Sequence, residues 1–212
     1  MEHTNRNPKE DLQAIREIME RSSKFLSLSG ISGVFAGVVG LIGALAIYMI
    51  IPDLSVLSAG RSEEEVNGLA NPTLILYLGL ILLLVLLVAV VGAVYFSVKK
   101  ARKANQPFWN SLTKRMMNYF LIPFVTGGLF TLILVYRNDI ELVVPAMLIF
   151  YGLALVNAGK FTIGEIHYLG ITEIALGVLA AVFVNLGWLF WAIGFGVMHI
   201  FYGIMMYFKY ER

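Results

Sequence analysis

Two ionisable residues, Glu173 and His199, lie inside the two long apolar runs that close the chain. Each lies 13 residues from Leu186, near the turn between the runs, so an antiparallel helical hairpin would place them at similar depth. Ionisable side chains within membrane segments are costly, and they mark ion, proton or substrate pathways. We therefore take Glu173 and His199 as a candidate substrate or proton site, and we add Asn157, which lies near the end of an earlier apolar run.

The same pair also permits a structural interpretation, in which hydrogen bonds satisfy both side chains and only fix the register of the helices. Haem or metal ligation is a third interpretation, but a haem between helices often uses two axial histidines, and one His here lies deep in an apolar run. The chain has no Cys, which excludes disulfides, cysteine nucleophiles and cysteine-ligated zinc. We expect no catalytic residue, no metal and no cofactor.

The composition is typical of a membrane protein. Hydrophobic residues make up 58% of the 212 residues, charged residues make up 14%, and the mean hydropathy is +0.78. A soluble domain carries about 25% charged residues, so most of this chain is expected to lie in lipid. Its length suits one compact bundle.

Six apolar segments are each close to the roughly 20 residues that a helix needs to span the hydrocarbon of a bilayer. They lie at about 25–51, 73–98, 116–136, 142–159, 168–185 and 187–208. We therefore predict an all-α integral membrane protein, whose transmembrane domain at 25–212 is a six-helix bundle of three consecutive antiparallel hairpins. An amphipathic helix is expected within residues 1–24, where apolar residues recur at helical spacing opposite a charged face.

The distribution of Lys and Arg predicts how the bundle is oriented. Most of these cations fall in four segments that would share one side of the membrane: residues 1–24, the 99–115 loop, the 160–167 turn and the C-terminal tail. Arg61 and Arg137 fall on the other side. Because cytoplasmic loops carry the excess of Lys and Arg, both termini are expected in the cytoplasm, with the candidate pair in the cytoplasmic half of the bundle.

Glycines recur at helical spacing in the first segment and in the two closing runs. They are Gly30, Gly33, Gly37 and Gly40 in the first segment, and Gly177, Gly196 and Gly203 in the closing runs. Small residues on one face let helix backbones approach closely in lipid. We therefore predict a helix-packing seam inside the bundle, with a seam between copies in a homo-oligomer as the alternative. The second segment has few small residues and is expected at the periphery.

The 99–115 loop combines six cations with Phe108 and Trp109. Beside two apolar segments, this composition indicates contact with the lipid bilayer and its anionic headgroups, with Trp109 as an interfacial anchor, rather than binding of nucleic acid. The same loop and the N-terminal helix could instead bind a cytoplasmic protein partner. In that case the protein would be a non-catalytic scaffold or partner subunit.

Gly30-Ile31-Ser32-Gly33 matches the GxSG pattern of rhomboid-type intramembrane serine hydrolases, which pair this Ser with a His on a later span. Here His199 would be the partner of Ser32. The motif stands on the first span instead of the later span usual in that family, however, and the helper polar residues have no counterpart. The chain also has no HExxH, Walker A or GxGxxG motif, so an enzyme is a remote alternative.

Two stretches, SSKFLSLSGISGVFAG in the first segment and GFGVMHIFYGIMMYFKYER at the end, resemble an uncharacterised family of bacterial six-span inner-membrane proteins. The six-span layout extends this similarity over the whole chain. The resemblance implies an integral protein of the bacterial cytoplasmic membrane, and it implies no activity. From the residues themselves, we expect small-molecule, ion or proton-linked transport, or membrane sensing, through Glu173 and His199.

Overall fold

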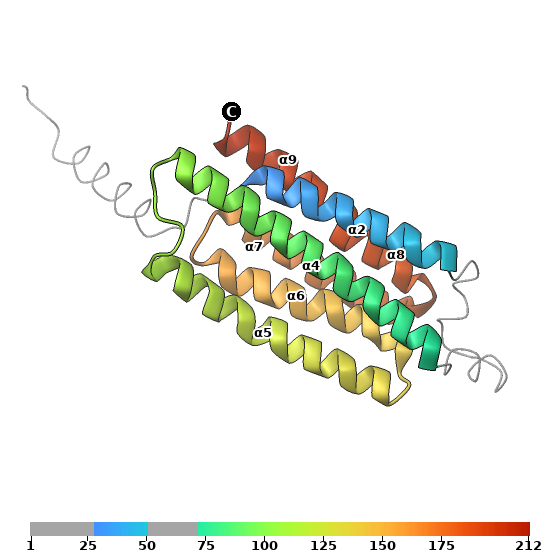
Figure 1. Cartoon of the computed structure of the whole chain (residues 1–212). Helices are drawn as coiled ribbons and strands as arrows, with labels where there is room; N and C mark the ends of the chain where they lie inside the picture. The colour runs from blue at the N-terminus through green and yellow to red at the C-terminus, as the bar shows by residue number, and fades with distance from the viewer. Residues whose placement is uncertain (1–27, 51–71) are drawn as a thin grey trace, which may run out of the picture.

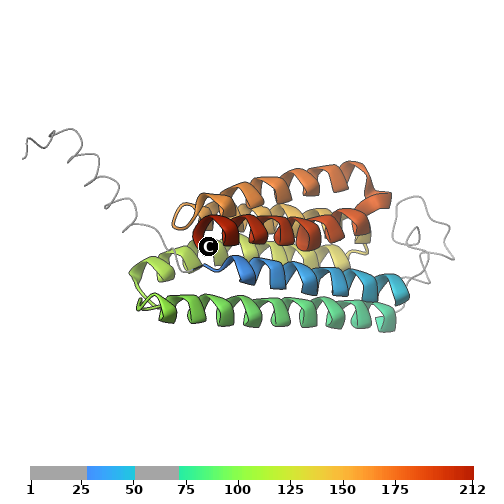
Figure 2. The same cartoon turned by 90° about the horizontal axis from the view of Figure 1, so that it is seen from above.

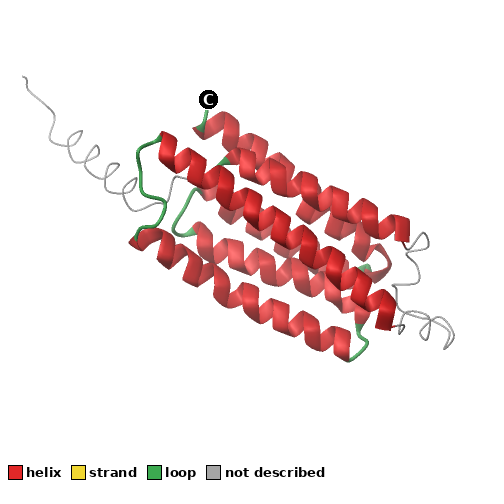
Figure 3. Ribbon diagram, in the orientation of Figure 1, coloured by secondary structure: helices red, strands yellow, loops and turns green. Residues whose placement is uncertain are grey.

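The computed structural model describes residues 28–50 and 72–212, and these residues form helices joined by turns and short loops, without a strand (Figure 3). The amphipathic helix expected within residues 1–24 lies outside the described residues. Six of the described helical stretches are long and apolar enough to cross a membrane. The prediction of an all-α chain with six helices of membrane-spanning length is therefore confirmed.

The first five candidate spans, called spans below, are α2 (Gly30–Ile50), α4 (Pro72–Lys103), α5 (Ser111–Tyr136), α6 (Val143–Gly159) and α7 (Gly164–Val182) (Figure 1). The short 3₁₀ helix η2 (Ile140–Leu142) precedes α6. The last span consists of the 3₁₀ turn η3 (Val184–Leu186), α8 (Gly187–Trp191), the π-helix η4 (Ala192–Met198) and α9 (His199–Tyr210). A π-helical segment therefore interrupts the middle of the last span, and hydropathy alone does not indicate it.

Two spans extend further than their hydropathy predicts. α4 continues to Lys103 instead of ending near residue 98, and α5 begins at Ser111 instead of near residue 116. Hydropathy marks the part of a helix that suits lipid, whereas backbone hydrogen bonding carries the helix on into the polar region. Asn110 caps α5, because its side-chain oxygen accepts a hydrogen bond from the Thr113 backbone N–H at 2.8 Å.

The helices form two closely packed groups. In the first, which we call the α2 group, α2 packs against α4 and against η4 and α9 of the last span. In the second, the α6 group, α6 packs against α5 and α7. Figures 1 and 2 show both groups running side by side along the bundle, and they meet where α6 and α7 face the last span.

Glycines at helical spacing bring α2 against the last span: Gly30, Gly33, Gly37 and Gly40 from α2, and Gly196 and Gly203 from the last span. A Cβ atom at Gly37 would lie 2.6 Å from the carbonyl oxygen of Gly196, and one at Gly33 would lie 3.0 Å from the Cα of Gly203. The two backbones are therefore in direct contact, which a larger residue on this face would prevent.

A second seam of glycines holds α7 against α6. A Cβ atom at Gly152 would lie 2.6 Å from the carbonyl oxygen of Gly170, and one at Gly170 would lie 2.7 Å from the carbonyl oxygen of Gly152. Further along α7, Gly177 lies against Leu148 and Ile149 of α6. Each group of helices thus has its own backbone-to-backbone seam.

The bundle has one basic end. The start of α2, the α4–α5 loop, the α6–α7 turn and the C-terminus lie together there (Figures 1 and 2). The described cations of this end are Lys99, Lys100, Arg102, Lys103, Lys114, Arg115, Lys160, Lys209 and Arg212. At the far end, Arg137 pairs with Asp139 at 2.9 Å.

α4 forms an outer wall of the bundle. Leu80, Leu84, Leu87 and Val91 are each more than half exposed, as are several of their neighbours. Apolar side chains exposed along a helix of this length suit contact with lipid tails. The structure thus places α4 at the periphery of the bundle, as expected from its sequence.

Candidate functional site

Glu173 lies at the midpoint of α7, nine residues from Gly164 and nine from Val182, and its exposed fraction is 0%. α7 begins at Gly164 rather than near residue 168, so the carboxylate lies about 14 Å from either end of its helix and not in the half nearest the basic end, as its predicted span implied. Gly170 and Gly177, one turn to either side, let α6 approach this face closely and help to bury the carboxylate.

His199 is the first residue of α9 and directly follows the π-helix η4. Its Nδ1 donates a hydrogen bond to the carbonyl oxygen of Gly194, five residues earlier, at 2.9 Å. Because the imidazole turns back along its own helix, this side-chain bond lies against the π-helical segment η4, and single π-helical turns occur frequently at functional sites. Because a carbonyl oxygen only accepts, Nδ1 carries a proton whether the imidazole is neutral or charged.

The structure brings the two predicted residues together. Oε1 of Glu173 lies 3.4 Å from Nδ1 of His199, and the exposed fractions of the two side chains are 0% and 7%. The Nδ1 hydrogen points to Gly194, so the contact between the pair is electrostatic and is not a second full hydrogen bond.

Tyr151 of α6 is a third member of this cluster, and it was not predicted. Its hydroxyl lies 2.8 Å from Nε2 of His199, and the two rings stack at 5.5 Å between centroids. A Tyr in an apolar run resembles an ordinary core residue, and its hydroxyl, which needs a partner when buried, is the sole signal. Asn157, six residues further along α6, lies about 9 Å nearer the basic end, so the structure does not bring it into the cluster.

Aromatic rings surround the imidazole. Phe195 stacks on His199 at 6.1 Å between centroids and lies tilted against Tyr151 at 5.1 Å, and the Trp191 ring lies 5.3 Å from Phe195. The rings therefore surround the imidazole with mostly apolar surface.

The carboxylate of Glu173 is not satisfied. Neither of its oxygens has a hydrogen-bond partner among the described residues, and the same holds for Nε1 of Trp191 nearby in the last span. Buried polar side chains in folded proteins nearly always have a partner. The departure from this rule at Glu173 needs an explanation that fixing helix register does not give.

Little space remains around this carboxylate. A Cβ atom at Gly194 would clash with Oε2 of Glu173 and would lie 2.7 Å from Cδ2 of Leu148. The last span can approach Glu173 this closely because Gly194 has no Cβ. A ligand of several atoms has no room between Gly194 and the carboxylate.

Glu165, at the start of α7, is buried like Glu173 but has several partners. It accepts hydrogen bonds from Nζ of Lys209 at 2.5 Å and from the hydroxyl of Tyr210 at 2.9 Å. Its exposed fraction is 5%. The structure thus shows how a buried carboxylate of this protein is satisfied when its role is to tie two helices together.

Glu211, beyond the end of α9, is satisfied as well. It accepts hydrogen bonds from the backbone N–H of Gly30 at 2.6 Å, from the hydroxyl of Ser29 at 3.2 Å and from Nζ of Lys100 at 3.2 Å. A carboxylate at a helix N-terminus compensates the positive end of the helix dipole. Glu211 therefore joins the start of α2, the end of α4 and the C-terminus.

The residues considered for hydrolysis are engaged elsewhere. The hydroxyl of Ser32 donates to the carbonyl oxygen of Ser29, and both ring nitrogens of His199 have the partners described above. Within residues 28–50 and 72–212, no group of three or more His, Asp or Glu side chains is arranged to hold a metal ion.

No protein-family model, curated protein or solved structure matches this chain.

Proposed function

We propose that the protein is an integral protein of the bacterial cytoplasmic membrane that binds and releases a proton at Glu173 and His199, as part of proton-linked transport or membrane sensing. The observation that carries this proposal is the fully buried carboxylate of Glu173, which has no hydrogen-bond partner among the described residues and lies 3.4 Å from His199. Intramembrane carboxylates and histidines of this kind mark proton pathways.

The charge of the pair supports the proposal. An ionised Glu173 beside a neutral His199 would leave one uncompensated charge in a low-dielectric interior, which is strongly unfavourable. Electrical neutrality therefore requires one proton on the pair, either on the carboxylate or on the second nitrogen of the imidazole. In both cases the pair carries one proton, which it can release to another titratable group or to water.

The hydrogen bonds allow both positions of this proton. With Glu173 protonated and His199 neutral, Tyr151 donates to Nε2 and the carboxylic hydrogen lacks an acceptor among the described residues. With the proton on His199, Nε2 donates to the hydroxyl oxygen of Tyr151, and the tyrosine hydrogen needs a different acceptor. Neither arrangement satisfies every donor, so moving the proton changes one unsatisfied group for another.

The tight packing favours a proton over a larger ligand at the carboxylate. Gly194 lies so close to Oε2 of Glu173 that no Cβ fits between them. A proton adds almost no volume, whereas a sugar, an amine or a hydrated ion would have to displace the last span. Any larger substrate of a transport cycle would therefore bind elsewhere and be coupled to the pair.

We place the basic end, and with it both termini, in the cytoplasm, since Lys and Arg are concentrated at cytoplasmic ends of membrane proteins. The chain then forms three consecutive hairpins across the membrane. The exposed cations at the end of α4 and the start of α5, together with Trp109 between them, which is 64% exposed, would contact anionic headgroups.

The proposal is tested by infrared spectroscopy of the full-length protein in lipid, titrated across the pH range. We expect a protonated-carboxyl band that changes with pH, disappears in Glu173→Gln and shifts in His199→Gln. Glu141→Gln, which removes a carboxylate at the far end, is the matched control and should leave the band in place. A spectrum that is the same in wild type and Glu173→Gln would refute the proposal.

A second candidate function is that of a non-catalytic scaffold or partner subunit. The exposure of the cations at the end of α4 and the start of α5 favours it: these are Lys99, Arg102, Lys103, Lys114 and Arg115. In this case neutralising these cations, or deleting residues 1–24, would abolish association with a cytoplasmic partner while Glu173→Gln would not.

Ser32→Ala with unchanged activity would remove the hydrolase alternative.

A further inference from the structure

The surface between the α2 group and the α6 group carries three layers in order along the bundle. The Glu173–His199 pair lies in the middle, an apolar cluster lies between the pair and the basic end, and an ion pair closes that end. α7 supplies residues to all three layers from one side, and α9 supplies residues from the other.

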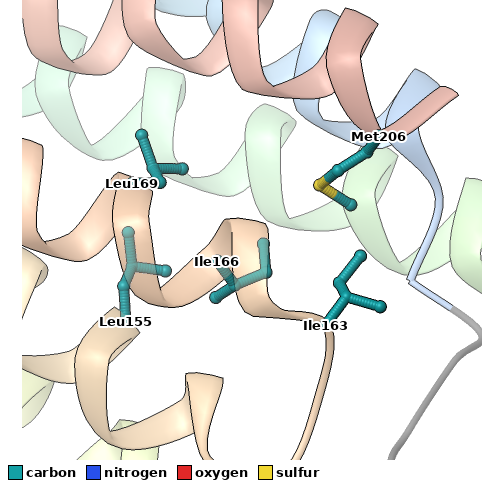
Figure 4. Close-up of a cluster of buried hydrophobic side chains, with 5 residues drawn as sticks. All are labelled: Leu155, Ile163, Ile166, Leu169 and Met206. Carbon is teal, nitrogen blue, oxygen red and sulfur yellow. The ribbon is translucent and has the colours of Figure 1, made fainter. Parts of the chain in front are cut away.

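The apolar cluster, which we call the plug, contains five buried side chains: Leu155, Ile163, Ile166, Leu169 and Met206. Each has an exposed fraction of 7% or less. Figure 4 shows the Met206 side chain projecting from α9 toward the side chains of α6 and α7. The plug is thus assembled from both groups of helices and would separate if the groups moved apart.

The plug adjoins the candidate site directly. Leu169 lies one turn before Glu173 on α7. Tyr151, whose hydroxyl contacts His199, also packs against the plug. Water that reached the pair from the basic end would have to pass between these apolar side chains, and no polar partner is available to it there among the plug residues.

Beyond the plug, Glu165 of α7 joins Lys209 and Tyr210 of α9, and we call this contact the latch. It lies between the two groups of helices, because α7 belongs to the α6 group and α9 belongs to the α2 group. Hydrogen bonds between charged groups are stronger than neutral ones. The latch therefore holds the ends of α7 and α9 together over the plug.

We propose that the latch and the plug form a closed gate between the basic end and the Glu173–His199 pair, which opens when the α6 group moves away from the α2 group. The inference rests on the proposed function in one respect, that the pair exchanges a proton with water. The gate adds to that function the route by which water reaches the pair. The basic end is shut in this conformation, so water can reach the pair from there only after the latch is broken.

The two groups can move as units because of how they are held together. Within each group, helix backbones touch through glycines such as Gly37 with Gly196 and Gly152 with Gly170. Between the groups near the basic end, the contacts are made by side chains, which include the plug, the latch and the hydroxyl contact of Thr172 with Tyr202 at 3.3 Å. Separation there breaks the ion pair and hydrogen bonds of the latch and this hydroxyl contact, and it exposes the apolar side chains of the plug, while both backbone seams stay intact.

The test uses the absence of Cys from the sequence, since each introduced thiol is then the sole reactive thiol. Met206→Cys places a reporter in the plug of the full-length protein in detergent, and a hydrophilic maleimide measures its access to water. We expect slow labelling in the Met206→Cys protein. Adding Glu165→Gln, or independently Lys209→Met, should raise the labelling rate about fivefold.

Two controls separate gate opening from general loosening. Asp139→Asn breaks an ion pair at the far end and should leave Met206→Cys labelling unchanged. Ala180→Cys reports from the far half of α7, where Ala180 has an exposed fraction of 0%, and its labelling should stay slow when the latch is broken. Equal labelling of Met206→Cys with and without the latch, or a rise at Ala180→Cys of similar size, would overturn the gate.

The gate and the proposed function fail in different measurements. If the latch variants open the plug but the infrared band of Glu173 is missing, the proton site is wrong and the gate stands as a property of the bundle. If the band titrates with pH but labelling does not respond to the latch, the proton site stands and the gate is wrong.

Discussion

Within each group of helices the closest backbone contacts are made at glycines, whereas the contacts between the groups include large and polar side chains. Gly33 and Gly203 let the backbones of α2 and α9 touch, and Gly152 and Gly170 do the same for α6 and α7. Across the surface between the groups, the contacts instead include a buried carboxylate, an imidazole and an ion pair.

This difference indicates where the molecule is rigid and where it can change. Backbone-to-backbone contacts have no rotamers to adjust, so they either fit or fail. Side-chain contacts between titratable groups can exchange partners when a proton arrives or leaves. The titratable groups Glu165, Glu173, His199 and Lys209 lie on the surface between the two groups, where the proposed proton-linked function and the proposed gate would both need them.

The largest effect is expected from breaking a seam. Gly203→Leu places a Cβ 2.5 Å from the backbone nitrogen of Val34 and 2.8 Å from the carbonyl oxygen of Gly30. Since backbone atoms cannot yield as a flexible side chain can, we expect a loss of about 3 kcal/mol or more in the free energy of unfolding. The measurement is reversible unfolding in mixed detergent micelles.

Gly128→Leu is the matched control for this prediction. A Cβ at Gly128 of α5 meets nothing within 4 Å, and the residue is exposed. Leu is also the better helix former by up to about 1 kcal/mol, so stability should be unchanged or slightly raised. Similar losses in both variants would mean that the glycine seams are not what holds the helices within each group together.

A smaller effect is expected within the α2 group at Glu211. Glu211→Ala removes the acceptor of the Gly30 N–H and the partner of Lys100, so the first turn of α2 loses its cap. We expect a loss of about 2 kcal/mol in the free energy of unfolding, which combines the loss of a cap with that of charge-assisted hydrogen bonds. Thermal unfolding at low and high salt measures it.

The exposed pair Arg137–Asp139 provides the comparison. The Arg137 side chain is largely exposed and the Asp139 side chain is partly exposed, with exposed fractions of 68% and 37%. Asp139→Ala should therefore cost at most about 0.5 kcal/mol. If the two substitutions reduce the free energy of unfolding by the same amount, the contacts of Glu211 contribute no more than an exposed ion pair, and Glu211 does not stabilise the start of α2.

A still smaller effect on stability, with a clear effect on the site, is expected for Tyr151→Phe. The substitution removes the hydroxyl that lies 2.8 Å from Nε2 of His199 and keeps the stacked ring. We expect a loss of about 1 kcal/mol, together with a changed pH dependence of the Glu173 infrared band. Tyr202→Phe, which removes only a 3.3 Å contact with Thr172, should change neither.

Much of the fold could be predicted because hydropathy and glycine spacing act through short stretches of chain. The run from Gly30 to Gly40 steps three and four residues at a time, and this alone places the glycines on one face of a helix. Span limits were less accurate, as at Lys103 and Ser111, because hydropathy does not report where helical hydrogen bonding stops.

The site was only partly predictable, for a different reason. Ionisable residues in apolar runs are visible in the sequence, and so Glu173 and His199 were found. Tyr151 became part of the site through the crossing of α6 with the last span, and Gly194 through the π-helix that turns His199 back onto its carbonyl oxygen. The contact of Tyr151 requires knowing which helices touch. The contact of Gly194 lies within the last span, but it requires knowing that the helix is π-helical there, which hydropathy does not indicate.

The smallest change in stability is expected at Glu173, where the functional effect is expected to be largest. Glu173→Gln keeps the shape of the side chain and removes the ionisable group from a site where its oxygens have no hydrogen-bond partner among the described residues. Replacing a poorly satisfied buried charge with a neutral group is often neutral or stabilising, so we expect a change within about 0.5 kcal/mol.

Glu165→Gln sharpens the contrast, because it makes the same chemical change in a carboxylate that is bonded to Lys209 and Tyr210. It should cost about 1 kcal/mol, a value held down by the 59% exposure of the Lys209 side chain. A Glu173→Gln protein less stable than Glu165→Gln would mean that the carboxylate supports the fold. An equally stable protein that has lost its proton-dependent band would mean that Glu173 is kept for the proton it carries.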